Sequence, residues 1–227
     1  MTTNDDDRPS ADVEDKWGFT SEAQIEGRRA LSRAIQRMLP ALLAGEIEDR
    51  ELFEAAATIE GWARRWEARV HPSRYDAKPR PNRGDFLDSI VHESHPILGQ
   101  ASPMAPPVTM RREDGIVVAE AVFGLAYEGI RGLVHGGWLA AMCDIVLGFA
   151  AGGTGRSSMT GTLTLRYRRP TPIGVEVRGV GRIVRIEGRK TLVAAELSVA
   201  GEVTVESEGV FIALPLEGMY GTPDGPG

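Results

Sequence analysis

The chain has 227 residues and a formal net charge of −6, from 26 basic and 32 acidic residues. That length accommodates one sizeable core plus an appendage, and the acidic balance argues against a nucleic-acid-binding protein, which is usually basic. The single cysteine, Cys143, excludes an internal disulfide framework and a cysteine-rich zinc site, and it favours a reducing compartment.

No targeting or membrane-spanning segment is expected. The first residues, MTTNDDDRPSADVEDK, are acidic and polar, without the apolar stretch of a secretory signal. The most apolar run, GWLAAMCDIVLGFAAGG, is too short to cross a bilayer, contains an acid and is rich in glycine. We therefore expect a soluble, cytoplasmic protein.

The N-terminal part is expected to be helical after a disordered acidic tail. Residues 1–18 contain six acids and few large apolar residues, which is typical of disorder. Residues 19–70 have a helix-forming composition, and AGEIED reads as a turn between two helices, so we expect a helical extension here. The apolar residues of the first predicted helix recur at roughly helical spacing: Ile25, Leu31, Ile35, Met38 and Leu42.

The remainder divides into an irregular connection and a second domain. Residues 71–114 contain many prolines and no clear hydrophobic period, which predicts a long irregular connection. Residues 115–214 alternate as strands around one apolar helix, and their TPIG, EGRK and GE turns are short enough for antiparallel hairpins. The sequence therefore predicts an α+β fold in this range and a flexible tail at 215–227.

The helix of this second domain is apolar on every side, so it must be covered all round, by a curled sheet or by a second subunit. Its start carries His135, Gly136 and Gly137. The N–H groups of a first helical turn lack internal partners, so they can bind a carbonyl oxygen and stabilise the negative charge it gains in acyl transfer. His135 either donates a further hydrogen bond or ends the loop, and the glycines alone are also explained by a tight turn.

Asp144 lies in the middle of the same helix, where we expect it to be buried. Burying a carboxylate is costly unless it is hydrogen-bonded or has a chemical role. Two interpretations stay open: an acid satisfied by a neighbouring backbone group or hydroxyl, or a catalytic general base or nucleophile.

The spacing of these groups constrains any shared chemistry. Gly136 and Asp144 are eight residues apart, which is about 12 Å along a helix. Groups that act on one carbonyl must lie within hydrogen-bond reach of it, directly or through one water. If both are catalytic, the site combines the antiparallel helices of two subunits, and the protein is at least a dimer.

The segment GLVHGGWLAAMCDIVLG, followed by SMTGTLTLRYRRPTPIG, resembles the hotdog-fold thioesterases, specifically the PaaI and THEM4-like acyl-CoA thioesterase group. The resemblance covers about residues 115–214. It implies a long central helix wrapped by an antiparallel β-sheet, assembly as a homodimer or larger homo-oligomer, and hydrolysis of an acyl-CoA thioester. It implies no metal or redox cofactor, because coenzyme A enters only as part of the substrate.

The resemblance also implies a role for each matching residue. Asp144 takes the general-base role, and the N–H of Gly136, helped by Gly137, polarises the thioester carbonyl. His135 matches the family's histidine at the helix cap, and Thr160 matches a Ser or Thr that orients the carboxylate or water. Three residues are expected to contact coenzyme A, unless they are ordinary residues of the strand surface: Tyr167, Arg168 and Arg185.

The sequence departs from part of the group near Gly129, in YEGIRG. Some PaaI-like enzymes carry an asparagine upstream of the histidine, whereas THEM4-like members often lack it, so the resemblance implies a subgroup in which stabilisation of the oxyanion depends more on the helix. His92 and His95 lack a cysteine or third histidine nearby, so we expect no metal site.

An acyl-CoA thioesterase is therefore the leading hypothesis. The alternative from another class is a hotdog module that binds acyl thioesters without cleaving them, as a sensor or assembly partner. Dehydration of a hydroxyacyl thioester ranks last, because the helix lacks the Asp–His pairing that is usual in hydratases.

Overall fold

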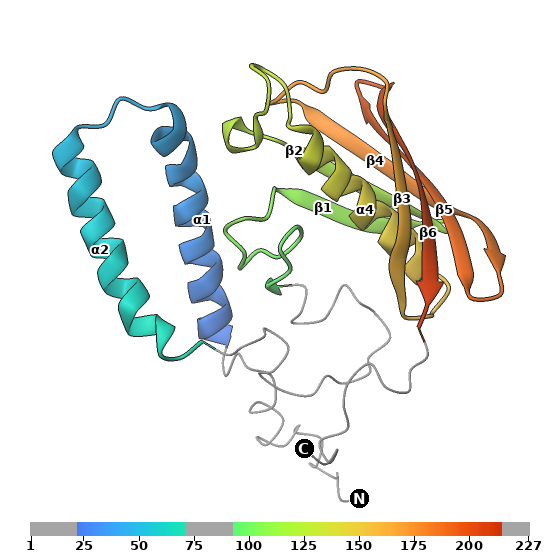
Figure 1. Ribbon diagram of the computed structural model, residues 1–227, viewed down its shortest axis with the longest axis horizontal. Coiled ribbons are helices and arrows are strands. Elements are labelled where there is room, and N and C mark those ends of the chain that lie inside the picture. Colours follow the sequence, from blue (N-terminus) through green and yellow to red (C-terminus); the bar gives the residue numbers. More distant parts are fainter. Residues whose placement is uncertain (1–21, 71–92, 215–227) are drawn as a thin grey trace, which may run out of the picture. The chain divides into compact units, whose positions relative to one another are not determined.

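The computed structural model describes residues 22–70 and 93–214, which form two compact units divided between residues 103 and 104 (Figure 1). The expected disordered tail at 1–18, the flexible tail at 215–227 and most of the Pro-rich connection lie outside the described residues. The two units are described separately below.

The first unit contains the predicted helical extension. Helix α1 spans Glu22–Ala44 and α2 spans Asp49–Glu67, so both predicted helices and the turn between them are confirmed. The segment 93–103 is held to α1 by polar contacts. Arg29 Nε donates to Glu93 Oε2 at 2.9 Å, and the Gln36 side-chain amide donates to the Ser102 carbonyl at 3.5 Å.

The second unit is a six-stranded antiparallel sheet with one long helix, which confirms the predicted α+β hotdog fold. The strand order is β1-β2-β4-β5-β6-β3, so β1 and β3 are the edge strands. Short hairpins join β4 to β5 and β5 to β6, at the predicted EGRK and GE turns. The hairpin predicted at TPIG is wrong, because β3 pairs with β6 and does not pair with β4. The strands are β1 Val108–Glu113, β2 Ile116–Val122, β3 Ser158–Tyr167, β4 Glu176–Glu187, β5 Lys190–Val199 and β6 Glu202–Ala213, with a short 3₁₀ helix, η3, at Leu125–Tyr127.

Strand β1 lies inside the stretch that we expected to be irregular, and it pairs with β2 along its whole length. The sheet therefore begins before residue 115. The strand shows no apolar alternation because it is an edge strand, with four of its six residues exposed. Two prolines, Pro106 and Pro107, directly precede it and strengthened the expectation of an irregular segment.

Helix α4, Gly136–Gly152, packs across the sheet (Figure 1). Its buried face includes Met142, Val146 and Leu147. Gly181 of β4 lets the helix approach closely, since a Cβ there would lie 2.6 Å from Val146 Cγ1. The sheet covers only one side of the helix. A stripe of the opposite flank stays half-exposed: Ala140, Ala141, Asp144, Ile145 and Gly148.

Candidate active site

The first turn of α4 is capped by His135. Its backbone is extended (φ −61°, ψ 132°), and its Nδ1 accepts a hydrogen bond from the Gly137 N–H at 3.0 Å. Because Nδ1 is the acceptor, the neutral ring carries its proton on Nε2, which can donate to a ligand. The cap also occupies the Gly137 N–H, which we had expected to help polarise a carbonyl. The N–H of Gly136 has no hydrogen-bond partner among the described residues, so it is the available backbone donor.

Gly129 lies directly behind this histidine. A Cβ at Gly129 would lie 2.8 Å from His135 Cα and 3.1 Å from His135 Cδ2. No real Cβ tolerates the first of these distances, so an asparagine does not fit here without moving the cap. In this loop, a side chain at Gly129 would therefore displace the histidine that caps α4.

Asp144 is hydrogen-bonded and only half-buried, so our expectation of a buried acid is wrong for the single chain. Thr160 Oγ1 on β3 donates to Asp144 Oδ1 at 2.9 Å. One carboxylate oxygen is thus held by a hydroxyl, and the side chain lies on the flank of α4 that the sheet leaves uncovered. This pairing agrees with both interpretations of Asp144, a satisfied acid and an oriented general base.

An irregularity in β3 allows Thr160 to reach the helix. The register against β6 shifts between Thr160 and Thr162, which leaves Gly161 as an extra residue in the strand. Thr160 pairs with the buried Phe211, and Leu163 pairs with the buried Gly209, so both lie on the helix side of the sheet although they are three residues apart. In a regular strand these two side chains would point to opposite faces. The glycine itself is the sole sequence signal for this bulge.

Tyr167, at the end of β3, contacts the start of α4. Its hydroxyl donates to the Gly136 carbonyl at 2.9 Å. Burial, with a smaller contribution from Cys143, raises the pKa of Tyr167, so the hydroxyl stays protonated and able to donate. The contact of Tyr167 with coenzyme A stays a prediction, whereas its hydrogen bond to the helix start is a role that the sequence did not indicate.

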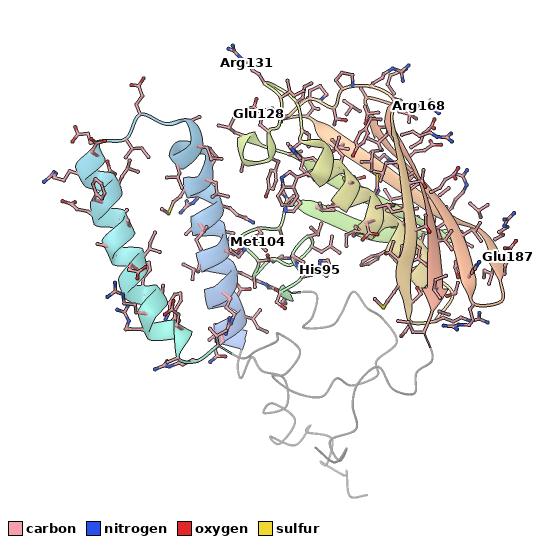
Figure 2. The ribbon with its side chains drawn as sticks, in the orientation of Figure 1. His95, Met104, Glu128, Arg131, Arg168 and Glu187 are labelled. Carbon is pink, nitrogen blue, oxygen red and sulfur yellow. The ribbon has the colours of Figure 1, made fainter. Side chains whose placement is uncertain are left out.

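The two arginines expected to contact coenzyme A are both in ion pairs. Arg168 Nη2 lies 2.6 Å from Glu206 Oε2, and this contact lowers the pKa of Glu206. Arg185 Nε lies 2.9 Å from Glu187 Oε1. Figure 2 shows Arg168 and Glu187 at opposite ends of the sheet. Arg168 therefore lies at the end of the sheet that is near the start of α4. Arg185, two residues from Glu187, lies toward the other end, which agrees with the alternative that it is an ordinary residue of the strand surface.

A cavity of about 670 Å³ opens at the start of α4. The loop before the helix forms one side, and the segment after β3 forms the other. Its lining side chains are half apolar and half polar, and the polar ones are the capping histidine, Tyr167, two arginines and a threonine. It is lined by Gly129, Ile130, Leu133, Val134, His135, Gly136, Leu139, Tyr167, Arg168, Arg169, Pro170 and Thr171.

Within one chain, the structure brings the predicted site residues together in two separate pairs, and these two pairs do not meet in a single site. Thr160 meets Asp144, and Tyr167 meets Gly136. Asp144 does not line the cavity, and eight residues of helix separate it from Gly136, about 12 Å. Over residues 22–70 and 93–214, no group of three or more His, Cys, Asp or Glu side chains is placed to hold a metal ion. His92 lies outside this range.

Comparison with known proteins gives consistent matches. The sequence model of the thioesterase superfamily matches residues 131–206. The acyl-coenzyme A thioesterase THEM4 of Bos taurus is 37% identical over 92 residues, which are 40% of this chain and 38% of that protein. THEM4 of Mus musculus is 32% identical over 94 residues, which are 41% of this chain and 40% of that protein. The match therefore spans well under half the length of these relatives.

A solved structure matches more of the chain. A crystal structure described as a thioesterase superfamily protein has a TM-score of 0.70 and 29% sequence identity, and the match covers 82% of this chain and 94% of that one. Among the described residues, no helix combines the length and apolar character needed to span a membrane.

Proposed function

We propose that this chain, whose residues 131–206 match the sequence model of the thioesterase superfamily, hydrolyses acyl-CoA thioesters to a free carboxylic acid and coenzyme A. The relatives from Bos taurus and Mus musculus are named acyl-coenzyme A thioesterases. The observation that carries the proposal is the pair of groups on α4: a hydroxyl-bonded carboxylate, Asp144, and an unoccupied N–H donor at Gly136.

Each group has a defined task in thioester hydrolysis. Asp144 takes a proton from water as the water oxygen attacks the thioester carbon, and Thr160 keeps the carboxylate in one orientation. The carbonyl oxygen becomes negative and is stabilised by the Gly136 N–H and by His135 Nε2–H. Collapse of the tetrahedral intermediate breaks the C–S bond, and the leaving thiolate takes the proton that Asp144 removed from water, which gives coenzyme A and the free acid and restores the carboxylate.

We further propose that the active protein is a homodimer or a larger homo-oligomer whose sites each use two chains. The uncovered flank of α4 consists mainly of small residues around Asp144, which suits close packing against a second helix. Strand β3 has a single neighbour, β6, and seven of its ten residues are exposed in the single chain, all except Ser158, Leu163 and Leu165. Two antiparallel copies of α4 place the start of one beside the middle of the other.

The substrate and the compartment follow from the same site. Coenzyme A would enter beside Tyr167 and Arg168, at the end of the sheet where the cavity opens. The only thiol, Cys143, is buried and unpaired, which suits a reducing compartment such as the cytoplasm.

The test is thiol release from a panel of acyl-CoAs, from acetyl to long-chain and aromatic, by wild type and Asp144→Asn. We expect hydrolysis by wild type and a loss of several orders of magnitude in the variant, with the same oligomeric mass by light scattering. Tight acyl-CoA binding without thiol release across the panel would instead identify a non-catalytic binding module. Undiminished turnover in Asp144→Asn would refute the mechanism.

A further inference from the structure

The peptide group between Gly136 and Gly137 is held at both of its polar ends. Its carbonyl oxygen, on Gly136, accepts from Tyr167 Oη at 2.9 Å. Its N–H, on Gly137, donates to His135 Nδ1 at 3.0 Å. Two consecutive glycines have more backbone freedom than any other dipeptide, and no side chain of their own restricts them. The two hydrogen bonds therefore supply a restraint that the sequence at these positions lacks.

The backbone around Tyr167 is held in place by hydrogen bonds and an ion pair, so its hydroxyl can restrain the Gly136 carbonyl. Its backbone pairs with Val205 at the end of the β3–β6 ladder. The next two residues donate their N–H groups to a single carbonyl, that of Thr204, at 2.7 and 3.2 Å. Arg168 adds its ion pair to Glu206. The strand end is thus fixed to β6 immediately after the tyrosine.

The tyrosine ring also lies beside the space that a side chain at Gly136 would occupy. A Cβ built on Gly136 would lie 3.4 Å from Tyr167 Oη and 3.5 Å from Cζ, so the ring packs over this position at ordinary van der Waals distance. Replacing tyrosine by phenylalanine removes the hydrogen bond while leaving the ring in place. The hydroxyl can therefore be tested separately from the packing.

We propose that Tyr167 is a positioning residue whose hydroxyl, together with His135 Nδ1, fixes the Gly136–Gly137 peptide and so aims the neighbouring Gly136 N–H at the thioester carbonyl. The proposal rests on the proposed function of the helix start. The Gly136 N–H and the Gly136–Gly137 peptide are joined through the Cα of Gly136. When the two hydrogen bonds fix the plane of this peptide, the Gly136 N–H can point in a narrower range of directions. Without the hydroxyl, the glycine pair rotates more freely and the donor points at the carbonyl for less of the time.

Tyr167→Phe is expected to lower kcat about three- to tenfold, less than the roughly 100-fold or greater loss from deleting an oxyanion donor, with KM changed by less than about twofold. The matched control is Tyr127→Phe. The Tyr127 hydroxyl donates to the Ala105 carbonyl at 3.0 Å, so the control also removes one bond from a tyrosine to a backbone carbonyl in the same unit. We expect the control to keep the wild-type kcat.

Amide hydrogen exchange tests the clamp without using activity. The chain contains one His-Gly step, so ¹³C-carbonyl histidine with ¹⁵N-glycine isolates the Gly136 amide, and two Gly-Gly steps, so ¹³C-carbonyl glycine with ¹⁵N-glycine narrows the 27 glycines to Gly137 and Gly153. Tyr167→Phe should speed exchange of the Gly137 N–H at least threefold, and Tyr127→Phe should not, since exchange reports local opening.

Each outcome decides one question. Unchanged Gly137 exchange in Tyr167→Phe would overturn the clamp, and so would a wild-type kcat. A rise in KM alone would show that the tyrosine only contacts coenzyme A. If the wild-type protein releases no thiol from any acyl-CoA, the proposed function fails and the aiming of the donor fails with it, whatever the exchange experiment shows.

Discussion

Replacing Gly136 by proline deletes the proposed oxyanion donor with little disturbance of the helix. Gly136 is the first residue of α4, a position where proline is favoured because the N–H is not used within the helix. The preceding residue, His135, already has the extended backbone that proline requires of its neighbour (φ −61°, ψ 132°). The substitution therefore removes a hydrogen-bond donor from the site while the helix is expected to keep its start.

The expected loss is that of one oxyanion-hole donor, about 10²–10³ in kcat, or about 2.7–4 kcal/mol of transition-state stabilisation. Gly136→Ala is the matched control, because it retains the N–H. Its Cβ would lie no closer than 3.4 Å to any heavy atom near it, Tyr167 Oη being the nearest, so it fits without displacement. We expect Gly136→Ala to lower kcat by less than about tenfold, since it keeps the N–H donor.

The assay is thiol release from the best acyl-CoA of the panel, with kcat and KM measured separately and thermal unfolding followed by circular dichroism. Both variants should unfold close to the wild-type temperature. If Gly136→Pro keeps kcat within about threefold of Gly136→Ala, the Gly136 N–H does not stabilise the oxyanion.

The remaining predictions concern neighbouring groups. Thr160→Val should lower kcat about tenfold, because the Asp144 carboxylate loses the hydroxyl that orients it, whereas Thr160→Ser should stay near wild type; equal loss in both would contradict the role of the hydroxyl. Gly129→Asn should lower the free energy of unfolding by about 1–3 kcal/mol in urea without raising kcat, because its Cβ would lie 2.8 Å from His135 Cα. Burial raises the pKa of Cys143 from 9.0 to about 11, so the folded state retains its proton longer than the unfolded state, and stability should fall as pH rises from about 9 to 11. Replacing Cys143 by alanine should flatten that part of the pH profile.

Much of the fold could be predicted because its signals are local. Helix α4 is apolar, begins at a histidine followed by two glycines and ends at a glycine pair, so its extent could be predicted closely. The hairpins between β4, β5 and β6 follow from short turns between alternating segments. Strand β1 could not be predicted in the same way, because an exposed edge strand has no reason to alternate.

Some features of the candidate site could likewise be predicted from local sequence, and others depend on how the elements pack. Asp144 and Gly136 are conspicuous because a carboxylate and paired glycines are unusual in an apolar helix. The half-exposure of Asp144, the occupation of the Gly137 N–H and the contact of Tyr167 with Gly136 depend on which elements pack together, so they required the fold. The exclusion of an asparagine at Gly129 likewise depends on where the histidine lies in space.

The central claim is that each active site takes Asp144 from one chain and Gly136 from its partner. Co-expression of Asp144→Asn and Gly136→Pro chains with two different affinity tags, followed by tandem purification, isolates the mixed dimer. In a shared site, one of its two sites combines both intact groups, so we predict about half the wild-type activity per dimer, although each variant alone is nearly inactive. Activity in the mixed dimer no higher than in the separate variants would contradict the account.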